Sequence, residues 1–291
     1  MAETTPAQRG GMTDGNDQAV SGTDQGGGPR VQVADTGGGT VRVQPRWYIG
    51  VAVFVAYLAI VSVIWAVVGF DYDSVAESTE NVRNGIVVPI GVGAVFLAGV
   101  TTYLGWWGPV MREVPRTAPR WTLLVPVGIL LIALAMALSV DPDQVSTGFL
   151  LTLAAGVLLV GFSEELLTRG LTLVGFRGQV SEGWAWFASS ALFALLHGIN
   201  LLFGQSFAAT AQQMVFAFVL GSALYVARMA TGYLAAAMLL HALWDFGAIG
   251  SEATDSANVV ASLFIYPLGI LALVAVFFVV RAKNAERVRQ H

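Results

Sequence analysis

Long apolar runs alternate with short polar breaks from Trp47 to the end of the chain. Most runs approach or exceed the ~20 residues that an α-helix needs to cross a hydrocarbon core of ~30 Å. The breaks contain aspartate, glycine, proline or arginine, which interrupt or end apolar helices. We therefore predict an all-α fold, a polytopic membrane helix bundle of about eight transmembrane helices. The predicted spans are residues 47–70, 85–108, 121–140, 147–177, 184–201, 208–229, 232–249 and 257–280.

The composition supports a membrane protein and excludes several kinds of chemistry. The chain has 291 residues, of which 55% are hydrophobic and only 12% are charged, unlike a soluble globular domain. It contains no cysteine, which excludes disulfides, thiolate metal sites and a cysteine nucleophile. The formal net charge of -4 gives no reason to expect nucleic-acid binding. The expected partners are therefore the lipid bilayer and molecules within it.

The two ends of the chain differ from the apolar region between them. Residues 1–46 are rich in Gly, Thr, Asp and Gln, so they are expected to form a disordered cytoplasmic tail. Residues 47–280 form the expected membrane domain, and residues 281–291 form a basic C-terminal tail. With the N-terminus inside, all 15 Lys and Arg residues except Arg83 are assigned to one side. This bias predicts a multi-pass protein of the cell membrane with both termini cytoplasmic.

Three ionisable side chains interrupt the fourth apolar run. Glu164 and Glu165 are adjacent, and Arg169 lies four residues after Glu165. The i, i+4 spacing places Glu165 and Arg169 on one helix face, where they are expected to form an ion pair. Glu164 is then left without an obvious local partner. Charged groups at membrane depth normally face a protein interior and mark function, although a charge cluster at a helix end that reaches the surface is the simpler alternative.

Two further polar pairs lie on later apolar runs: Phe193 with His197, and His241 with Asp245, each four residues apart. A lone histidine in an apolar helix is more often a hydrogen-bonded packing residue than a catalyst. Counted at ~1.5 Å per residue, however, Glu164, His197 and Asp245 each lie roughly 20 Å from the cytoplasmic side, with His241 one turn shallower. We therefore expect these groups to meet, provided that the fourth helix continues past the glutamate pair.

The three motifs EExxxR, FxxxH and HxxxD occur in this order on successive apolar segments. In this they resemble the CPBP family, the CAAX proteases and bacteriocin-processing enzymes that are also called the Abi family. Type II CAAX prenyl endopeptidases belong to this family. The motifs lie within residues 145–250, inside the expected protease domain.

The resemblance implies an intramembrane glutamate-type endopeptidase. By position, Glu164 is similar to the carboxylate that activates water, and His197 to the histidine that shares this water. His241 and Asp245 correspond to residues that stabilise the oxyanion. The best-studied eukaryotic relatives have Asn at the last of these positions, which leaves the role of Asp245 open. The resemblance also implies a supporting role for Glu165, Arg169 and Phe193.

Two other readings remain open. Two His, a Glu and an Asp are a reasonable set for Zn²⁺, which would make a metal-dependent intramembrane protease. The chain lacks the HExxH motif that would favour zinc, so we expect no metal and no cofactor. The third reading is a non-enzymatic membrane immunity or scaffold protein with buried ion pairs. For an enzyme, the expected substrate is a membrane-anchored peptide or protein.

Overall fold

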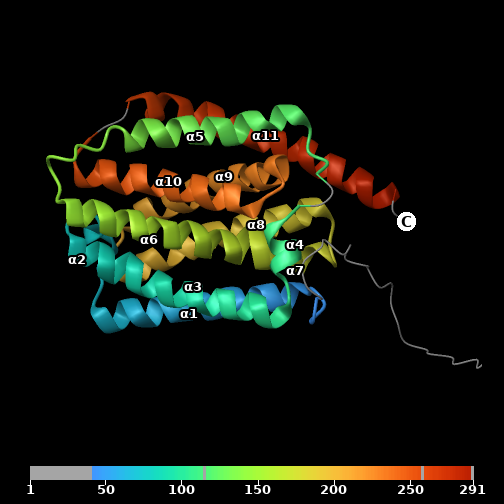
Figure 1. The fold of residues 1–291 in the computed structure, drawn as a ribbon, viewed down its shortest axis with the longest axis horizontal. Coiled ribbons are helices and arrows are strands. Elements are labelled where there is room, and N and C mark those ends of the chain that lie inside the picture. The colour runs from blue at the N-terminus through green and yellow to red at the C-terminus, as the bar shows by residue number, and fades with distance from the viewer. Residues whose placement is uncertain (1–40, 114–115, 257–258, 290–291) are drawn as a thin grey trace, which may run out of the picture. The chain divides into compact units, whose positions relative to one another are not determined.

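The computed structural model describes residues 41–113, 116–256 and 259–289 (Figure 1). Within these ranges the regular elements are helices, and one isolated antiparallel bridge joins Arg112 to Tyr233. In chain order the helices are α1 (Trp47–Val68), η1 (Tyr72–Ser74), α2 (Thr79–Val82), η2 (Arg83–Val87), α3 (Val88–Leu104), α4 (Trp107–Met111), η3 (Arg120–Leu123), α5 (Leu124–Ala137), α6 (Thr147–Glu165), η4 (Leu166–Thr172), α7 (Leu173–Arg177), α8 (Glu182–Leu196), η5 (His197–Phe203), α9 (Phe207–Thr231), α10 (Leu234–Ala253) and α11 (Val259–Arg289).

Eight helical stretches among the described residues are long and apolar enough to cross a membrane, which confirms the predicted fold class. The second stretch begins at Thr79 rather than at 85, because α2 and the π-helix η2 run directly into α3. The last one extends past 280, since α11 continues through the basic residues to Arg289. Most of the expected N-terminal tail lies outside the described residues. Its end, residues 41–46, makes backbone hydrogen bonds from Arg42 and Val43 to Leu104.

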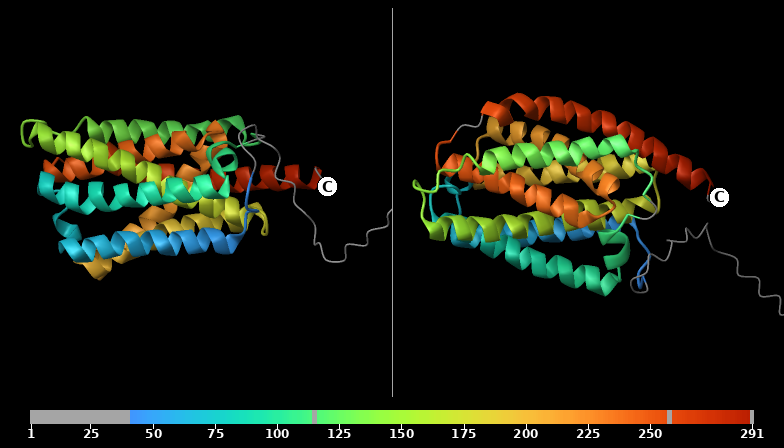
Figure 2. Two further views of the ribbon diagram at one scale, coloured as in Figure 1. Left: turned by 60° about the horizontal axis from the view of Figure 1, so that its bottom comes forward. Right: turned by 45° about the horizontal axis from the view of Figure 1, so that its top comes forward.

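Helices α6 and α10 pack against each other in the middle of the bundle. Figures 1 and 2 show α5 and α11 on one side of this pair and α1 and α3 on the other. Helix α9 packs against α8, α10 and α11. The approach of α6 to α10 needs a glycine, because a Cβ at Gly161 would collide with the carbonyl oxygen of Met238. In lipid, close packing of this kind replaces the hydrophobic effect as the force between helices.

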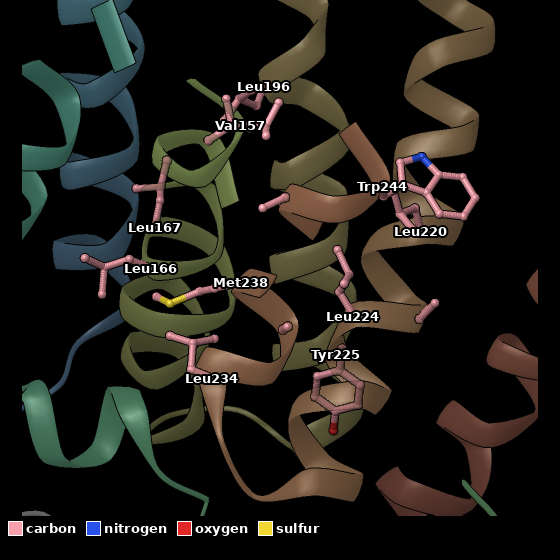
Figure 3. Packing of buried hydrophobic residues seen from close by; sticks show 14 of the residues in the cluster. Val157, Leu166, Leu167, Leu196, Leu220, Leu224, Tyr225, Leu234, Met238 and Trp244 are labelled. Atoms are coloured by element: carbon pink, nitrogen blue, oxygen red, sulfur yellow. The ribbon is translucent and has the colours of Figure 1, made fainter. Parts of the chain in front are cut away.

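Apolar side chains from α6, α9 and α10 fill the space between these helices (Figure 3). Leu166 and Leu167 come from η4, which continues α6, Leu224 comes from α9 and Leu234 from α10, and all four are fully buried. Many other large apolar side chains are exposed on the outside of the bundle. Leu138, for example, is 84% exposed. An apolar exterior around a packed interior suits a protein whose solvent is the hydrocarbon of a bilayer.

The bundle has two ends, which we name for use below. The terminal end contains residues 41–46, 177–182 and 231–234, together with the last turns of α11, and the opposite end contains residues 69–78 and 138–146. In Figure 1 these are the right and left ends respectively.

A buried ion cluster closes the terminal end. The Glu113 carboxylate lies 2.7 Å from Arg177 Nη1, 2.9 Å from Lys283 Nζ and 3.4 Å from Arg228 Nε. Burial alone would raise the pKa of Glu113, but these three cations outweigh it and lower the pKa to about 2. Because Lys283 lies on α11, Arg177 on α7 and Arg228 on α9, the cluster holds the end of α11 against the rest of the bundle.

Candidate active site

The first motif lies where the geometry of one long helix changes. Glu164 and Glu165 are the last two residues of α6, and the π-helix η4 follows at once and carries Arg169. The helical path then continues to Arg177 as α7, which confirms that the fourth span runs past the glutamate pair. Wider π-helical turns are uncommon and often occur at functional sites. The sequence pattern did not indicate this one.

Glu165 and Arg169 form the predicted ion pair. Arg169 Nη1 lies 2.8 Å from Glu165 Oε1, and both side chains are fully buried at 0% exposure. The guanidinium also donates from Nε to the carbonyl of Gly221, at 3.3 Å, and its carbon lies 4.0 Å from the centroid of the Phe193 ring. A side chain at position 221 would strike Arg169, because a Cβ there would lie 2.5 Å from Nη2. Arg169 is therefore held on several sides, which fixes the Glu165 carboxylate in turn.

Glu164 is placed differently from its neighbour. Its side chain is buried, with the residue only 6% exposed, and its Oε2 atom has no hydrogen-bond partner among the described residues. The nearest basic group is His241, whose Nε2 lies 4.0 Å from Oε2. This agrees with the expectation that Glu164 lacks a local partner. A buried carboxylate oxygen with no bond inside the protein is costly unless water or a ligand reaches it.

His241 lies on α10 between three carboxyl groups. Its Nδ1 is 3.2 Å from Glu165 Oε1, the same oxygen that accepts from Arg169, and its Nε2 is 3.5 Å from Asp245 Oδ2. An ionised carboxylate only accepts hydrogen bonds, so Nδ1 carries a hydrogen and donates it to Glu165. The other ring nitrogen is thereby directed toward Asp245 and Glu164.

His197 occupies the point where α8 ends and the 3-10 helix η5 begins. Its Nδ1 lies 2.9 Å from the carbonyl oxygen of Phe193. Since a carbonyl oxygen only accepts, Nδ1 carries the hydrogen, and in the neutral ring the lone pair of Nε2 can then accept one. The Phe193 ring meets the rings of His197 and His241 edge-on, with centroids 5.1 Å and 5.4 Å away. Phe193 thus contacts both histidines as well as Arg169.

A single cavity of about 380 Å³ brings the four predicted catalytic residues together. Glu164, His197, His241 and Asp245 all line it, and so does Phe193. Glu165 and Arg169 do not line the cavity, but Glu165 contacts His241, which does. The structure therefore brings these polar groups together in one cavity, as the sequence led us to expect.

The cavity wall also contains polar residues that the sequence did not single out. Tyr57 of α1 lines the cavity and is only 1% exposed, but a tyrosine in an apolar helix carries no signal of its own. Asn200 donates to Gln213 at 3.0 Å, and Gln213 donates to Tyr72 at 2.8 Å. Asn200 could have been identified from the sequence, because it follows His197 by three residues in an otherwise apolar stretch.

No group of three or more His, Asp or Glu side chains in the described ranges is placed so that it could hold a metal ion. The site is instead a set of carboxyl and imidazole groups within a cavity, inside a bundle of apolar helices. Together they define a multi-pass membrane protein with a buried acid–base site.

Residues 144–247 match the family model described as "Type II CAAX prenyl endopeptidase Rce1-like". The matched segment contains all three motifs, from Glu164 to Asp245. These residues are therefore an Rce1-like CAAX endopeptidase domain, a hydrolase of the CAAX protease family, which confirms the resemblance of the motifs. No curated protein and no solved structure matches the chain.

Proposed function

We propose that the protein is an intramembrane glutamate-type endopeptidase, which hydrolyses peptide bonds of membrane-associated substrates without a metal. The observation that carries the proposal is the free oxygen of Glu164. It belongs to a buried carboxylate that shares a cavity with two histidines, inside a segment that matches an endopeptidase family. Oε2 of the neighbouring Glu165 also lacks a hydrogen-bond partner among the described residues, but Oε1 of Glu165 binds Arg169 and His241, and Glu165 does not line the cavity.

Glu164 and His197 are the groups that would activate water. A water molecule in the cavity would donate one hydrogen to Glu164 Oε2 and the other to the free lone pair of His197 Nε2. As its oxygen attacks the peptide carbonyl, Glu164 takes a proton and then passes it to the nitrogen of the leaving amine when the C–N bond breaks. General acid–base catalysis by a positioned group of this kind contributes about 10²–10⁴-fold.

His241 and Asp245 are the groups that would stabilise the oxyanion. His241 is oriented by its bond to Glu165, so its Nε2 faces the cavity side of the site. When protonated, Nε2 is a donor for the negative oxygen of the tetrahedral intermediate. Asp245 helps directly only when it is protonated and donates a hydrogen bond. When ionised, it serves instead to orient His241 at 3.5 Å.

Glu165, Arg169 and Phe193 are positioning residues in this scheme. Glu165 accepts from both Arg169 and His241 on one oxygen, which ties the first motif to the third. Phe193 links the second motif to the other two, because its ring contacts Arg169 and both histidines. Such packing keeps reacting groups within the short range that productive geometry requires.

We also place the enzyme in the cell membrane with both termini in the cytoplasm. The support is the charge distribution, because the predicted spans assign every Lys and Arg except Arg83 to the side of the termini. In this orientation the terminal end of the bundle faces the cytoplasm and the opposite end faces away from it.

The proposed function is tested by cleavage of a peptide library. The purified full-length protein in detergent is incubated with the library, and products are identified by mass spectrometry. The proposal expects cleavage at internal peptide bonds by the wild type and none by Glu164→Gln, which keeps the shape of the side chain but not its basicity. Cleavage by Glu164→Gln at the wild-type rate would remove Glu164 from its role, and a wild type that cleaves nothing would contradict the proposed function.

A further inference from the structure

The cavity extends in one direction from the catalytic groups. Along α1 it is lined by Tyr57, Val61 and Trp65, which lie progressively nearer the end of that helix. Along α10 it continues from His241 through Asp245 and Ile249 to Glu252, one residue before the helix ends. The cavity therefore runs from the site toward the opposite end of the bundle.

Two carboxylates stand at the outer part of this cavity. Asp73 belongs to η1, which follows α1, and Glu252 belongs to the last turn of α10. Both side chains line the cavity, both are exposed, and Asp73 acts electrostatically on Glu252. No lysine or arginine of the described ranges lines the cavity. Arg83, the one basic residue assigned to this side, is paired with Glu80 at 3.1 Å.

Neutral hydrogen-bonding groups line the same cavity as these carboxylates and the catalytic groups. Asn200, Gln213 and Tyr72 form the hydrogen-bonded row described above, and all three line the cavity. Burial raises the pKa of Tyr72 to about 12, so its hydroxyl stays uncharged near neutral pH. Amide and hydroxyl groups of this kind suit an extended peptide backbone, whose N–H and C=O groups need partners once they leave water.

We propose that the cavity is the substrate channel, entered from the membrane face opposite the chain termini, and that Asp73 and Glu252 select a substrate segment with a positively charged side chain. This inference rests on the proposed function. The distance along α10 between the site and Glu252 also predicts where the positive charge lies in the substrate. Seven residues of α10 separate Asp245 from Glu252, or roughly 10 Å. An extended peptide covers that length in about three residues, so the Lys or Arg lies about three positions from the cleaved bond.

The direction of access is tested with single cysteines, since the chain has none of its own. Asp73→Cys places a thiol at the channel mouth, and Arg116→Cys places one on an exposed residue near the terminal end. Intact cells are treated with a membrane-impermeant maleimide. We expect labelling of Asp73→Cys in intact cells, and labelling of Arg116→Cys only after the membrane is permeabilised. The reverse pattern would overturn the proposed direction of access.

The charge preference is tested with two peptides that carry Lys or Glu about three positions from the cleaved bond. The double variant Asp73→Asn/Glu252→Gln is compared with Asp143→Asn, an exposed acid at the same end that does not line the cavity. We expect the ratio of kcat/KM for Lys over Glu to fall about three- to tenfold in the double variant. High salt should reduce the wild-type ratio in the same direction.

A ratio that is equal in the wild type and the double variant, or that falls equally in Asp143→Asn, would overturn the charge preference. The labelling needs no substrate, so it is independent of cleavage. If Asp73→Cys is protected in intact cells while the wild type still cleaves, the proposed function stands and the direction of access is wrong. If labelling is as expected but no peptide is cleaved, the proposed function fails, and with it the role of the cavity as a substrate channel.

Discussion

The buried ion pair of the first motif gives a direct test of how the site is held together. In Glu165→Gln, Arg169 keeps its charge but loses its only carboxylate within ion-pair distance among the described residues, and the acceptor of the His241 Nδ1 hydrogen becomes an uncharged amide oxygen. Both members of the pair are at 0% exposure, so water does not reach the guanidinium to replace the lost partner. The chain offers a matched control in Glu80→Gln, which breaks the exposed Arg83–Glu80 pair of similar length.

The structure predicts a much larger loss of stability for Glu165→Gln than for Glu80→Gln. Removing one member of a buried pair costs about 3–5 kcal/mol, because an unpaired charge is left in the interior. For a domain of this size that loss lowers the Tm by about 6–20 °C. The side chains of the control pair are 56% and 71% exposed. Such a pair contributes about 0–1 kcal/mol, so its loss shifts the Tm by less than about 4 °C.

The assay is thermal unfolding of the purified proteins in one detergent, followed by the fluorescence of the chain's 8 tryptophans. A third variant, Glu165→Leu/Arg169→Met, removes both charges, and we expect it to regain part of the lost stability, because it leaves no unpaired charge in the interior, whereas His241 Nδ1 loses its acceptor. Equal Tm shifts for Glu165→Gln and Glu80→Gln would refute the reasoning. So would a double variant less stable than Glu165→Gln.

Three further predictions follow from individual contacts. Gly221→Ala should lower stability by about 1–3 kcal/mol in the same unfolding assay, because its Cβ displaces Arg169, whereas Gly99→Ala, which meets nothing within 4 Å, should not destabilise the protein. Glu113 has its pKa lowered to about 2 from 4.5, so its stabilising effect is present above its ordinary pKa and is lost as pH falls toward 2. Glu113→Gln should therefore be less stable near neutral pH, and the difference from the wild type should shrink in acid. An equal difference at both pH values would contradict this. Asp245→Asn should keep substantial activity, with a rate that falls less at alkaline pH than that of the wild type. A folded but inactive Asn variant would mean that the negative charge of Asp245 is needed, and its oxyanion role would be wrong.

Much of the architecture could be predicted from apolar patterning. The spans follow from length and hydropathy, since each must cross the same thickness of hydrocarbon. The ends of the spans were predicted less accurately than their number. Helix η2 joins α2 to α3 through Arg83 and Asn84, which lie outside the predicted span 85–108. The π-helix η4 was not predicted, because the apolar pattern of residues 166–172 does not distinguish a π-helix from an α-helix.

The candidate site could be predicted because its residues are polar in apolar surroundings and share a depth. The i, i+4 spacing of Glu165 and Arg169 also specified their pairing. The cluster around Glu113 could not be predicted in this way, because its partners Arg177, Arg228 and Lys283 are far apart in the sequence and meet only through packing. Tyr57 was missed for a different reason. Its position in the cavity depends on the rotation of α1, which a uniformly apolar helix does not reveal.

The most direct test of the central claim is the rate of peptide cleavage by protein from which metals have been removed. The wild type and Glu164→Gln are purified identically, dialysed against a strong chelator, checked by elemental analysis, and assayed on one cleavable peptide with and without added Zn²⁺. The account predicts that the stripped wild type keeps its full rate, that Zn²⁺ does not raise it, and that Glu164→Gln is inactive in both conditions. Loss of wild-type activity on stripping, with recovery on adding stoichiometric Zn²⁺, would contradict the account and identify the enzyme as a metalloprotease.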